Sequence, residues 1–187
     1  MAIETRMSGG AYERLALADP DRKWELRDGH LREKPGMTAA HNELAVTLGY
    51  MLLSQLDRAA YRVRIDAGRL QRSEATYFIP DVFVVPTAHV IPLMDQQDVL
   101  EVYDQPLPLV VEVWSRSTGD YDVEEKLAVY QQRGDLEIWR IHPYERTLTA
   151  WRRLPDGSYE ETIHHEGVVS PTALPGVEID LAALFDD

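Results

Sequence analysis

The order of the predicted elements indicates an α+β (α/β mixed) fold, in which one mixed β-sheet is flanked by helices. Residues 37–56 carry apolar side chains at helical spacing. Residues 109–114 form an apolar run of strand length, broken by one glutamate, as in a central strand covered on both faces. Several strand-like segments follow a second helical segment. A hairpin, a helix, strands, a helix and more strands are typical of the α+β class.

The first half of the chain begins with a predicted hairpin over residues 24–34, because Asp28-Gly29 is the strongest short turn signal. The helix over residues 37–56 has Thr38 as its N-cap. Strands are predicted over residues 62–70 and 78–85, and Pro80-Asp81 lies at the head of the apolar part of the second. Three prolines and several acids predict a long surface loop over residues 86–106.

The second half continues from the strand over residues 109–114 through a polar turn to a helix over residues 122–133, closed by Gly134. Strands are predicted over residues 136–141, 148–153 and 159–164, and the tail suggests a strand edge and a short helix. Length favours a single domain over residues 1–187, with the hairpin at 24–34, a core at 37–153 and C-terminal strands and a helix at 158–187.

Composition excludes several classes of protein. The 187 residues are 44% hydrophobic and include no window of about 20 uninterrupted apolar residues, so we expect no membrane span. The first residues are charged and lack the apolar core of a secretory signal, and the chain has no cysteine. We therefore expect a cytoplasmic protein. The net charge of -13 argues against binding nucleic acid by broad electrostatic attraction.

Lysine is rare among the basic residues. Of the 19 Lys and Arg residues, only Lys23, Lys34 and Lys126 are lysines. A lysine amine can lose its proton when desolvated, whereas a guanidinium cannot. In a chain that prefers arginine so strongly, each lysine is a candidate for a chemical role.

Three residues break the local pattern of their segments. Asp81 follows Pro80 at the head of an apolar strand, Glu112 interrupts the apolar run at 109–114, and Lys126 lies at the margin of the apolar stripe of the second helix. A buried carboxylate costs several kcal/mol unless it is paired or binds a cation. Two carboxylates on neighbouring strands suit magnesium or manganese, which prefer hard oxygen ligands.

The ordered series of these residues resembles the PD-(D/E)XK nuclease superfamily, and more narrowly the Uma-two-type family of restriction endonucleases. The segments that carry the resemblance are WELRDGHL, His41, PDVFVV, LVVEVWSRST, DVEEKLAVYQQRGDLEIWRIHP and LPGVEIDL. Together they span about 150 residues. The resemblance implies a restriction-endonuclease-like core with a mixed central sheet flanked by helices.

The resemblance also implies the residues of a site for phosphodiester hydrolysis. Asp81 and Glu112 would bind magnesium, or manganese, with the backbone carbonyl of Val113 as a third ligand. Lys126 would orient the attacking water or stabilise developing charge. His41 and Glu25 are auxiliary candidates. The expected partners are DNA as substrate and, by analogy, a second copy of the chain in a homodimer that cuts both strands.

The sequence departs from the family pattern at three positions. The superfamily lysine usually lies two residues after the glutamate, where this chain has Trp114, so the role moves to Lys126. Arg116 replaces the usual proline of a Ser-Pro-Ser-Thr turn, and His142 replaces the usual aspartate before Pro143. None of these changes removes an expected metal ligand.

Each candidate also has a purely structural explanation. Glu112 could be satisfied by arginine or backbone amides, Asp81 could be a turn acid, and His41 could be a core or capping histidine. Lys126 could form an ordinary helix pair with Asp122, four residues earlier. The alternative function is accordingly a non-catalytic descendant of the nuclease fold that acts as a binding or regulatory module, which the charge of -13 favours.

Overall fold

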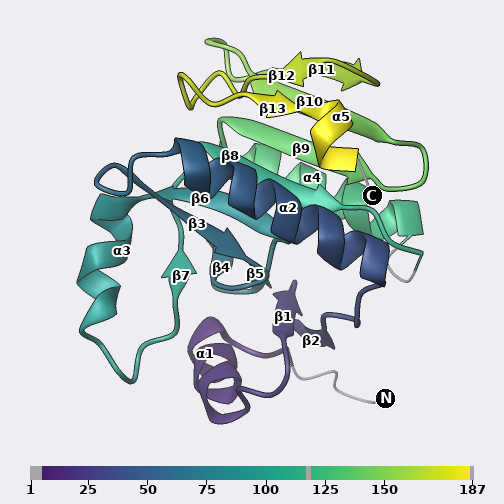
Figure 1. The fold of residues 1–187 in the computed structure, drawn as a ribbon. Helices are drawn as coiled ribbons and strands as arrows, with labels where there is room; N and C mark the ends of the chain where they lie inside the picture. Colours follow the sequence, from purple (N-terminus) through teal and green to yellow (C-terminus); the bar gives the residue numbers. More distant parts are fainter. Residues whose placement is uncertain (1–5, 117–118, 186–187) are drawn as a thin grey trace.

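A six-stranded mixed sheet forms the centre of the protein in a computed structural model (Figure 1). The structure describes residues 6–116 and 119–185, with the backbone alone for residues 119–123. The strand order is β11-β10-β9-β8-β6-β3, with β8 and β9 parallel and the other neighbours antiparallel. The strands are β3 (Tyr61–Ile65), β6 (Val82–Pro86), β8 (Leu109–Val113), β9 (Glu137–His142), β10 (Thr147–Arg153) and β11 (Tyr159–His164). The predicted central strand β8 lies between β6 and β9 and is buried along its whole length.

The two faces of this sheet bury different side chains, because successive residues of a strand point to opposite faces. Val111 and Trp139 pack with helix α2 (Ala39–Gln55) and with the C-terminal elements. These C-terminal elements are β12 (Val168–Val169), β13 (Ile179–Asp180) and α5 (Leu181–Phe185). Val110 and Ile138 pack on the other face with helix α4 (Gly119–Arg133). Glu112 therefore points to the α4 face, among the residues that pack there.

Local geometry confirms the predicted start of α2, the predicted end of α4 and the hairpin turn, whereas α4 begins at Gly119, earlier than the predicted start at residue 122. Thr38 caps α2, and its hydroxyl accepts a hydrogen bond of 3.3 Å from the backbone N–H of His41. Gly134 has a φ of +80° directly after α4, as a C′ glycine requires. Asp28 and Gly29 both have positive φ in the turn between β1 (Trp24–Arg27) and β2 (His30–Glu33), as a tight hairpin turn demands.

A second sheet corrects the prediction of one sheet. Its order is β2-β1-β5-β4-β7, with β4 at Arg69–Ser73, β5 at Thr76–Phe78 and β7 at Val102–Tyr103. The predicted strands at 62–70 and 78–85 each divide between the two sheets. The first breaks where Asp66 and Gly68 have φ of 48° and 72°, and the second breaks between Phe78 and Val82. Asp81 consequently lies at the junction of the sheets, where its carbonyl accepts a hydrogen bond of 2.7 Å from the N–H of Asp66.

Two helices were not expected from the sequence. Residues 86–106, predicted as a surface loop, contain α3 (Thr87–Met94) and β7, and Val90 of α3 is buried despite the proline inside the helix. Helix α1 (Gly9–Ala18) is capped by Ser8 and covers the second sheet through Tyr12, whose hydroxyl donates to the carbonyl of Trp24 at 2.5 Å. Among the described residues, no helix has the length and apolar character needed to cross a membrane.

Candidate active site

The predicted site residues meet where the two sheets join, between the start of α2 and the face of α4. Glu25 comes from β1, His41 from α2, Asp81 from the residue before β6, Glu112 from β8 and Lys126 from α4. All five side chains are buried, with Asp81 1% exposed and Glu112 7% exposed. The convergence of Asp81, Glu112 and Lys126, expected from the resemblance, is present in the fold.

Asp81 is surrounded by hydrogen-bond donors. Its Oδ1 accepts from Lys34 Nζ at 2.8 Å, and its Oδ2 lies 3.0 Å from His41 Nε2. The backbone N–H of Val113 also donates to Oδ2, at 2.7 Å. Burial alone would raise the pKa of Asp81, but the neighbouring Lys34 and His41 hold it well below its usual range. Asp81 is therefore an ionised carboxylate whose two oxygens are fixed in place.

Glu112 has a different environment. Its Oε1 accepts a hydrogen bond of 2.5 Å from the Tyr130 hydroxyl and lies 3.5 Å from Lys126 Nζ. Burial raises the pKa of Glu112 to about 8, with Lys126 lowering it in part and the Asp81 charge raising it further. Near neutral pH, this carboxyl gains a proton unless another positive charge replaces it.

Lys126 links the first hairpin to the central strand. Its Nζ donates to Glu25 Oε1 at 3.0 Å, and the same glutamate oxygen accepts from the backbone N–H of Ile79 at 2.8 Å. The lysine thus lies between two carboxylates, Glu25 and Glu112. The alternative partner suggested by the sequence, Asp122, has a side chain outside the described residues.

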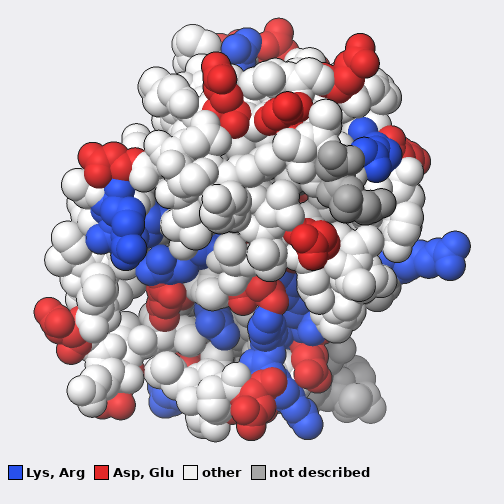
Figure 2. All heavy atoms as spheres, viewed as in Figure 1, with Lys and Arg blue, Asp and Glu red and all other residues white. Residues whose placement is uncertain are grey.

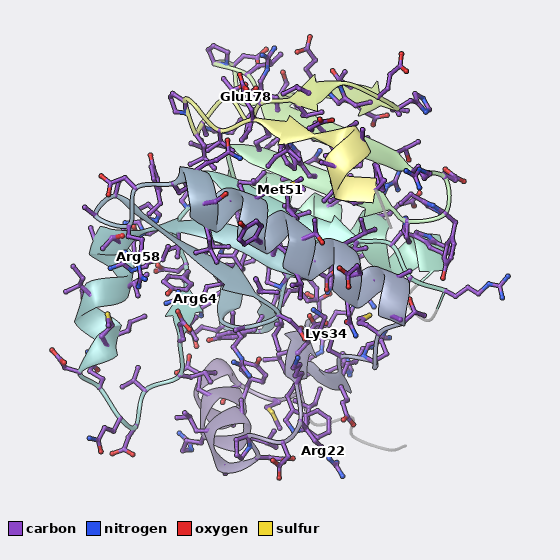
Figure 3. All side chains as sticks on the ribbon, in the orientation of Figure 1. Arg22, Lys34, Met51, Arg58, Arg64 and Glu178 are labelled. Atoms are coloured by element: carbon purple, nitrogen blue, oxygen red, sulfur yellow. The ribbon has the colours of Figure 1, made fainter. Side chains whose placement is uncertain are left out.

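Lys34 belongs to this cluster, although sequence reasoning did not name it as a site residue. It follows β2, lies between the hairpin and α2 in Figure 3, and contacts Asp66 Oδ1 and the carbonyl of Ile79, each at 2.9 Å. Burial lowers the pKa of Lys34, but Asp81, Glu112 and Asp66 together outweigh burial and raise it. Lys23 also pairs with Asp66. All three lysines of the chain therefore lie at this cluster, and their rarity was the signal that could have identified Lys34.

The buried acidic groups outnumber the buried ammonium groups. Three buried carboxyl groups, Glu25, Asp81 and Glu112, face two buried ammonium groups, Lys34 and Lys126. The cluster carries one negative charge in excess when Glu112 is ionised, and the raised pKa of Glu112 reflects that cost. In addition, His41 Nδ1 is buried without a hydrogen-bond partner among the described residues. The third carboxyl group and the oxygen donors fit a hard divalent cation in chemical type.

The arrangement itself is not a preformed metal centre. Within residues 6–116 and the described side chains of 124–185, no three His, Asp or Glu side chains are grouped to hold a metal ion. Lysine ammonium groups contact both carboxylates that the sequence assigned to the metal. Val113 contacts Asp81 through its backbone N–H, whereas its carbonyl is the group expected as a ligand. Cation binding would therefore require Lys126 to move away from Glu112.

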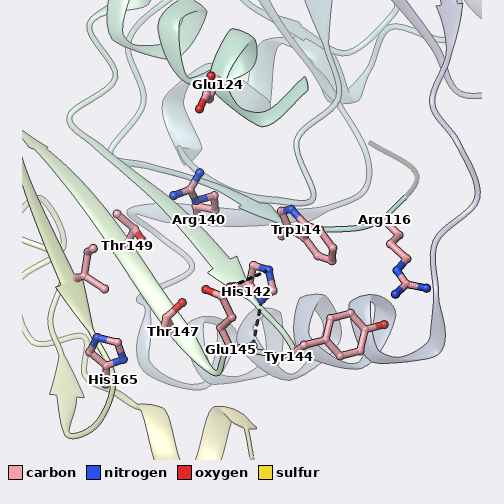
Figure 4. Close-up of a pocket in the computed structure, with 11 residues that line it drawn as sticks. Trp114, Arg116, Glu124, Arg140, His142, Tyr144, Glu145, Thr147, Thr149 and His165 are labelled. Carbon is pink, nitrogen blue, oxygen red and sulfur yellow. Dashed lines mark hydrogen bonds and ion pairs between the residues drawn. The ribbon is translucent and has the colours of Figure 1, made fainter. Parts of the chain in front are cut away.

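An open groove of about 980 Å³ lies on the α4 face of the sheet (Figure 4). Glu112 pairs in register with Arg140 of β9, so both side chains lie on the same face, and Trp114 follows on that face. Arg140 and Trp114 line the groove. The position that usually holds the superfamily lysine thus provides an aromatic wall beside the acid cluster.

Five arginines that lie close together in the sequence are not part of this groove: Arg58, Arg62, Arg64, Arg69 and Arg72. Figure 2 shows basic side chains gathered over β3 and α3 in one area and below α2 in another. Arg58 and Arg64 lie near the C-terminal end of α2 in Figure 3, and Lys34 lies near its other end. Arg64 is paired with Glu101 at 2.6 Å. These arginines are not among the residues that line the groove.

Comparison with known proteins agrees with the fold. The structure is similar to a crystal structure described as "a putative nuclease belonging to DUF820 from Anabaena variabilis ATCC 29413", with a TM-score of 0.76 and 17% identity over 96% of this chain and 97% of that one. This likeness shows the fold, a nuclease-like mixed α+β architecture. No curated protein matches the chain. A family model described as "Uma2: Putative restriction endonuclease" matches residues 10–182, and the protein therefore belongs to the Uma2 family.

Proposed function

We propose that this protein is a cytoplasmic, metal-dependent endonuclease that hydrolyses phosphodiester bonds in DNA. Membership of the Uma2 family supports a nuclease. The observation that carries the proposal is the excess of buried carboxylates over buried ammonium groups, next to a groove that contains Arg116 and Arg140. Ionising the third buried carboxyl is costly unless a cation compensates its charge.

Asp81 and Glu112 would hold magnesium, or manganese, together with the carbonyl of Val113. Such an ion supplies Lewis-acid polarisation of a phosphoryl oxygen and lowers the pKa of a bound water. The pKa of about 8 for Glu112 supports this assignment, since a carboxyl that is difficult to ionise in isolation gains most from a nearby positive charge.

Among the side chains of the cluster, Lys126 would contact the substrate, and the others would hold Lys126 and Asp81 in position. Lys126 has an ammonium between Glu25 and Glu112, from which it can donate a hydrogen bond to a phosphate oxygen as negative charge develops. Lys34 and His41 fix the two oxygens of Asp81 and act as positioning residues. Glu25 holds Lys126 through a bond of 3.0 Å and is in turn held by the Ile79 amide.

The experiment is calorimetric titration of magnesium and manganese into the wild type and Glu112→Gln, followed by incubation with mixed single- and double-stranded DNA in the same buffer. We expect the wild type to bind the cation and cleave DNA, and the variant to do neither. If neither protein binds a cation alone, cleavage decides, because substrate phosphates often complete such sites. Cleavage that persists in Glu112→Gln or in the presence of EDTA would refute the proposal.

A non-catalytic binding module is the second candidate, favoured by the way the protein already satisfies Asp81. Three donors from the chain contact its two oxygens, which is how a purely structural carboxylate is stabilised. The net charge of -13 points the same way. This function requires that no metal stimulates hydrolysis and that DNA binds weakly even at low salt.

A further inference from the structure

The groove beside the acid cluster is lined by aromatic rings. Trp114 stacks on the His142 ring, with centroids 4.4 Å apart and planes at 25°, and the Tyr144 ring meets Trp114 edge-on at 6.1 Å. Tyr144 is 63% exposed, so an aromatic surface faces the groove instead of the core (Figure 4). Exposed aromatic faces are the surfaces on which single-stranded nucleic-acid bases stack.

The charged groups of the groove are few. Arg116 and Arg140 supply positive charge, and the Arg140 guanidinium lies over the Trp151 ring at 5.3 Å. Of the two acids in the lining, Glu145 faces His142: its backbone N–H donates to His142 Nδ1 at 3.0 Å and its carboxylate lies 3.9 Å from Nε2. Glu124 of α4 lies on the opposite wall. An anionic ligand in this groove would therefore meet only two positively charged side chains among the described lining residues, Arg116 and Arg140.

The strand register places this aromatic surface next to the acid cluster. Glu112 and Arg140 are direct partners across the parallel strands, and the pairing continues one residue beyond β8, where Trp114 N–H donates to the carbonyl of Ile141 at 2.8 Å. A polynucleotide with its phosphate at Glu112 would have its next nucleotides in the groove. At about 980 Å³, the groove is at the large end of the range for small-ligand sites.

We infer that the groove binds unpaired nucleotides by stacking, so the substrate of the proposed nuclease is single-stranded DNA or a single-stranded segment within a duplex. The inference rests on the proposed function for the identity of the ligand. Bases in an intact duplex present their faces to one another and become available to an aromatic surface only when they leave the stack. One active site cuts one strand, so this substrate does not require the homodimer suggested by the resemblance.

The experiment measures binding without cleavage, in EDTA, by fluorescence anisotropy of a labelled 12-nucleotide oligo-dT. The variants are Tyr144→Ala, Trp114→Ala and the conservative Tyr144→Phe. The matched control is Tyr50→Ala, because Tyr50 is 71% exposed on α2 and outside the groove. We expect the Kd to rise about tenfold for each groove alanine, since one lost base stack has about this effect, and to stay unchanged for Tyr144→Phe and Tyr50→Ala.

Two further readouts distinguish stacking from general attraction. With two arginines in contact, log K should fall against log salt with a slope of about -1.4. A blunt duplex should compete poorly, whereas a duplex with an unpaired gap should compete well. Equal competition by the blunt duplex, or an unchanged Kd in both Tyr144→Ala and Trp114→Ala, would overturn the inference.

The outcome is separable from that of the proposed function. If the protein neither binds a cation nor cleaves DNA but binds oligo-dT through Tyr144, the nuclease fails and the groove stands as a single-strand binding site. If cleavage depends on Glu112 while binding ignores the groove variants, the nuclease stands and the groove inference fails.

Discussion

Two clusters of buried charge on α4 are satisfied to very different extents. At the C-terminal end of the helix, Arg133 pairs with Asp135 through two nitrogens, at 3.0 and 3.4 Å. The same guanidinium donates to the carbonyls of Gln71, Tyr103 and Gln105, and Asp135 Oδ1 also accepts from the N–H of Leu107 at 2.8 Å. One positive charge here meets one negative charge, and carbonyls accept the remaining guanidinium donors.

The cluster around Lys126 is of the opposite kind. It uses lysines in place of arginines, has three buried carboxylates for two buried ammonium groups, and includes His41 Nδ1 without a partner among the described residues. Burial raises the pKa of both Asp135 and Glu112, so a raised pKa alone does not separate the two clusters. The two clusters differ instead in the number of acids for each buried cation and in His41 Nδ1, which is unsatisfied within the described part of the chain. These differences identify the Lys126 cluster as the candidate site for a further cation or ligand.

Removing the arginine of the balanced cluster should have the largest effect. We expect Arg133→Ala to lower the free energy of unfolding by about 3–5 kcal/mol, because Asp135 would remain buried without its counter-charge. Urea denaturation measures this loss. Arg152→Ala is the control: Arg152 forms an exposed pair with Glu160 and should change stability by less than about 1 kcal/mol. A loss below 1 kcal/mol for Arg133→Ala would mean that the cluster is not a structural anchor.

Removing the lysine of the unbalanced cluster should instead affect chemistry. We expect Lys126→Gln to lower the rate of DNA cleavage by about 10²–10³-fold, since it removes a charged donor to the developing negative charge. Its affinity for magnesium should not fall, because a positive charge beside Glu112 has been removed. Single-turnover cleavage and calorimetry measure the two effects.

Lys23→Gln is the control for this prediction. Lys23 is also paired with an acid, Asp66, but its side chain is half exposed. Asp66 in turn contacts Lys34, which contacts Asp81, so the side chain of Lys23 is connected to the site through other side chains. Its cleavage rate should match the wild type. Equal loss in both variants would indicate a general effect of charge on DNA binding, and equal activity in both would remove Lys126 from the catalytic site.

The sequence predicts the elements whose signals are local. The helix beginning after Thr38, the Asp28-Gly29 turn and the buried strand at Glu112 each depend on neighbouring residues, and each is present. The division of residues 62–85 between two sheets was missed, because strand propensity does not tell which sheet a strand joins. Helix α3 was missed because its prolines and the acids after it resemble a loop. Burial of Val90 in the same apolar cluster as Val110 and Ile138 stabilises the helix.

The site was predictable to the extent that its residues break local patterns. Glu112 interrupts an apolar run and Asp81 heads an apolar strand, so both could be selected from sequence. Lys34 breaks no local pattern, since it follows a hairpin at a position where a charged residue is ordinary. Only the rarity of lysine marks it in the sequence, and only the tertiary fold brings it to 2.8 Å from Asp81. The groove depends on parallel pairing between β8 and β9, which are separated by α4 in the chain.

A pH titration would sharpen the contrast between clusters in metal-free protein. The pKa of Glu112 rises from 4.5 to about 8 on folding, so the folded state binds more protons than the unfolded state between these values. The contribution of Glu112 to stability is therefore present below pH 4.5 and is lost as the pH rises through 8. In EDTA at pH 8.5, we expect Glu112→Gln to be more stable than the wild type by at least about 1.4 kcal/mol, the equivalent of one pKa unit.

Thermal unfolding at pH 5 and 8.5 measures this difference. Glu145→Gln is the matched control, because the Glu145 side chain is 70% exposed and should show the wild-type pH dependence. If Glu112→Gln is no more stable than the wild type at pH 8.5, Glu112 is already compensated by its neighbours, and the cluster resembles the Arg133 cluster more than the geometry indicates.

The smallest effect concerns how the site is held. Thr38 caps α2 and accepts from the N–H of His41, whose ring is fixed separately by Asp81 at 3.0 Å. We expect Thr38→Ala to lower the free energy of unfolding by about 1 kcal/mol, and Thr38→Ser to restore it. The cleavage rate per folded molecule should stay within about threefold of the wild type, which corresponds to a change in activation free energy of less than about 0.7 kcal/mol. A much larger loss of cleavage would show that the start of α2, and not the contact with Asp81, sets the position of His41.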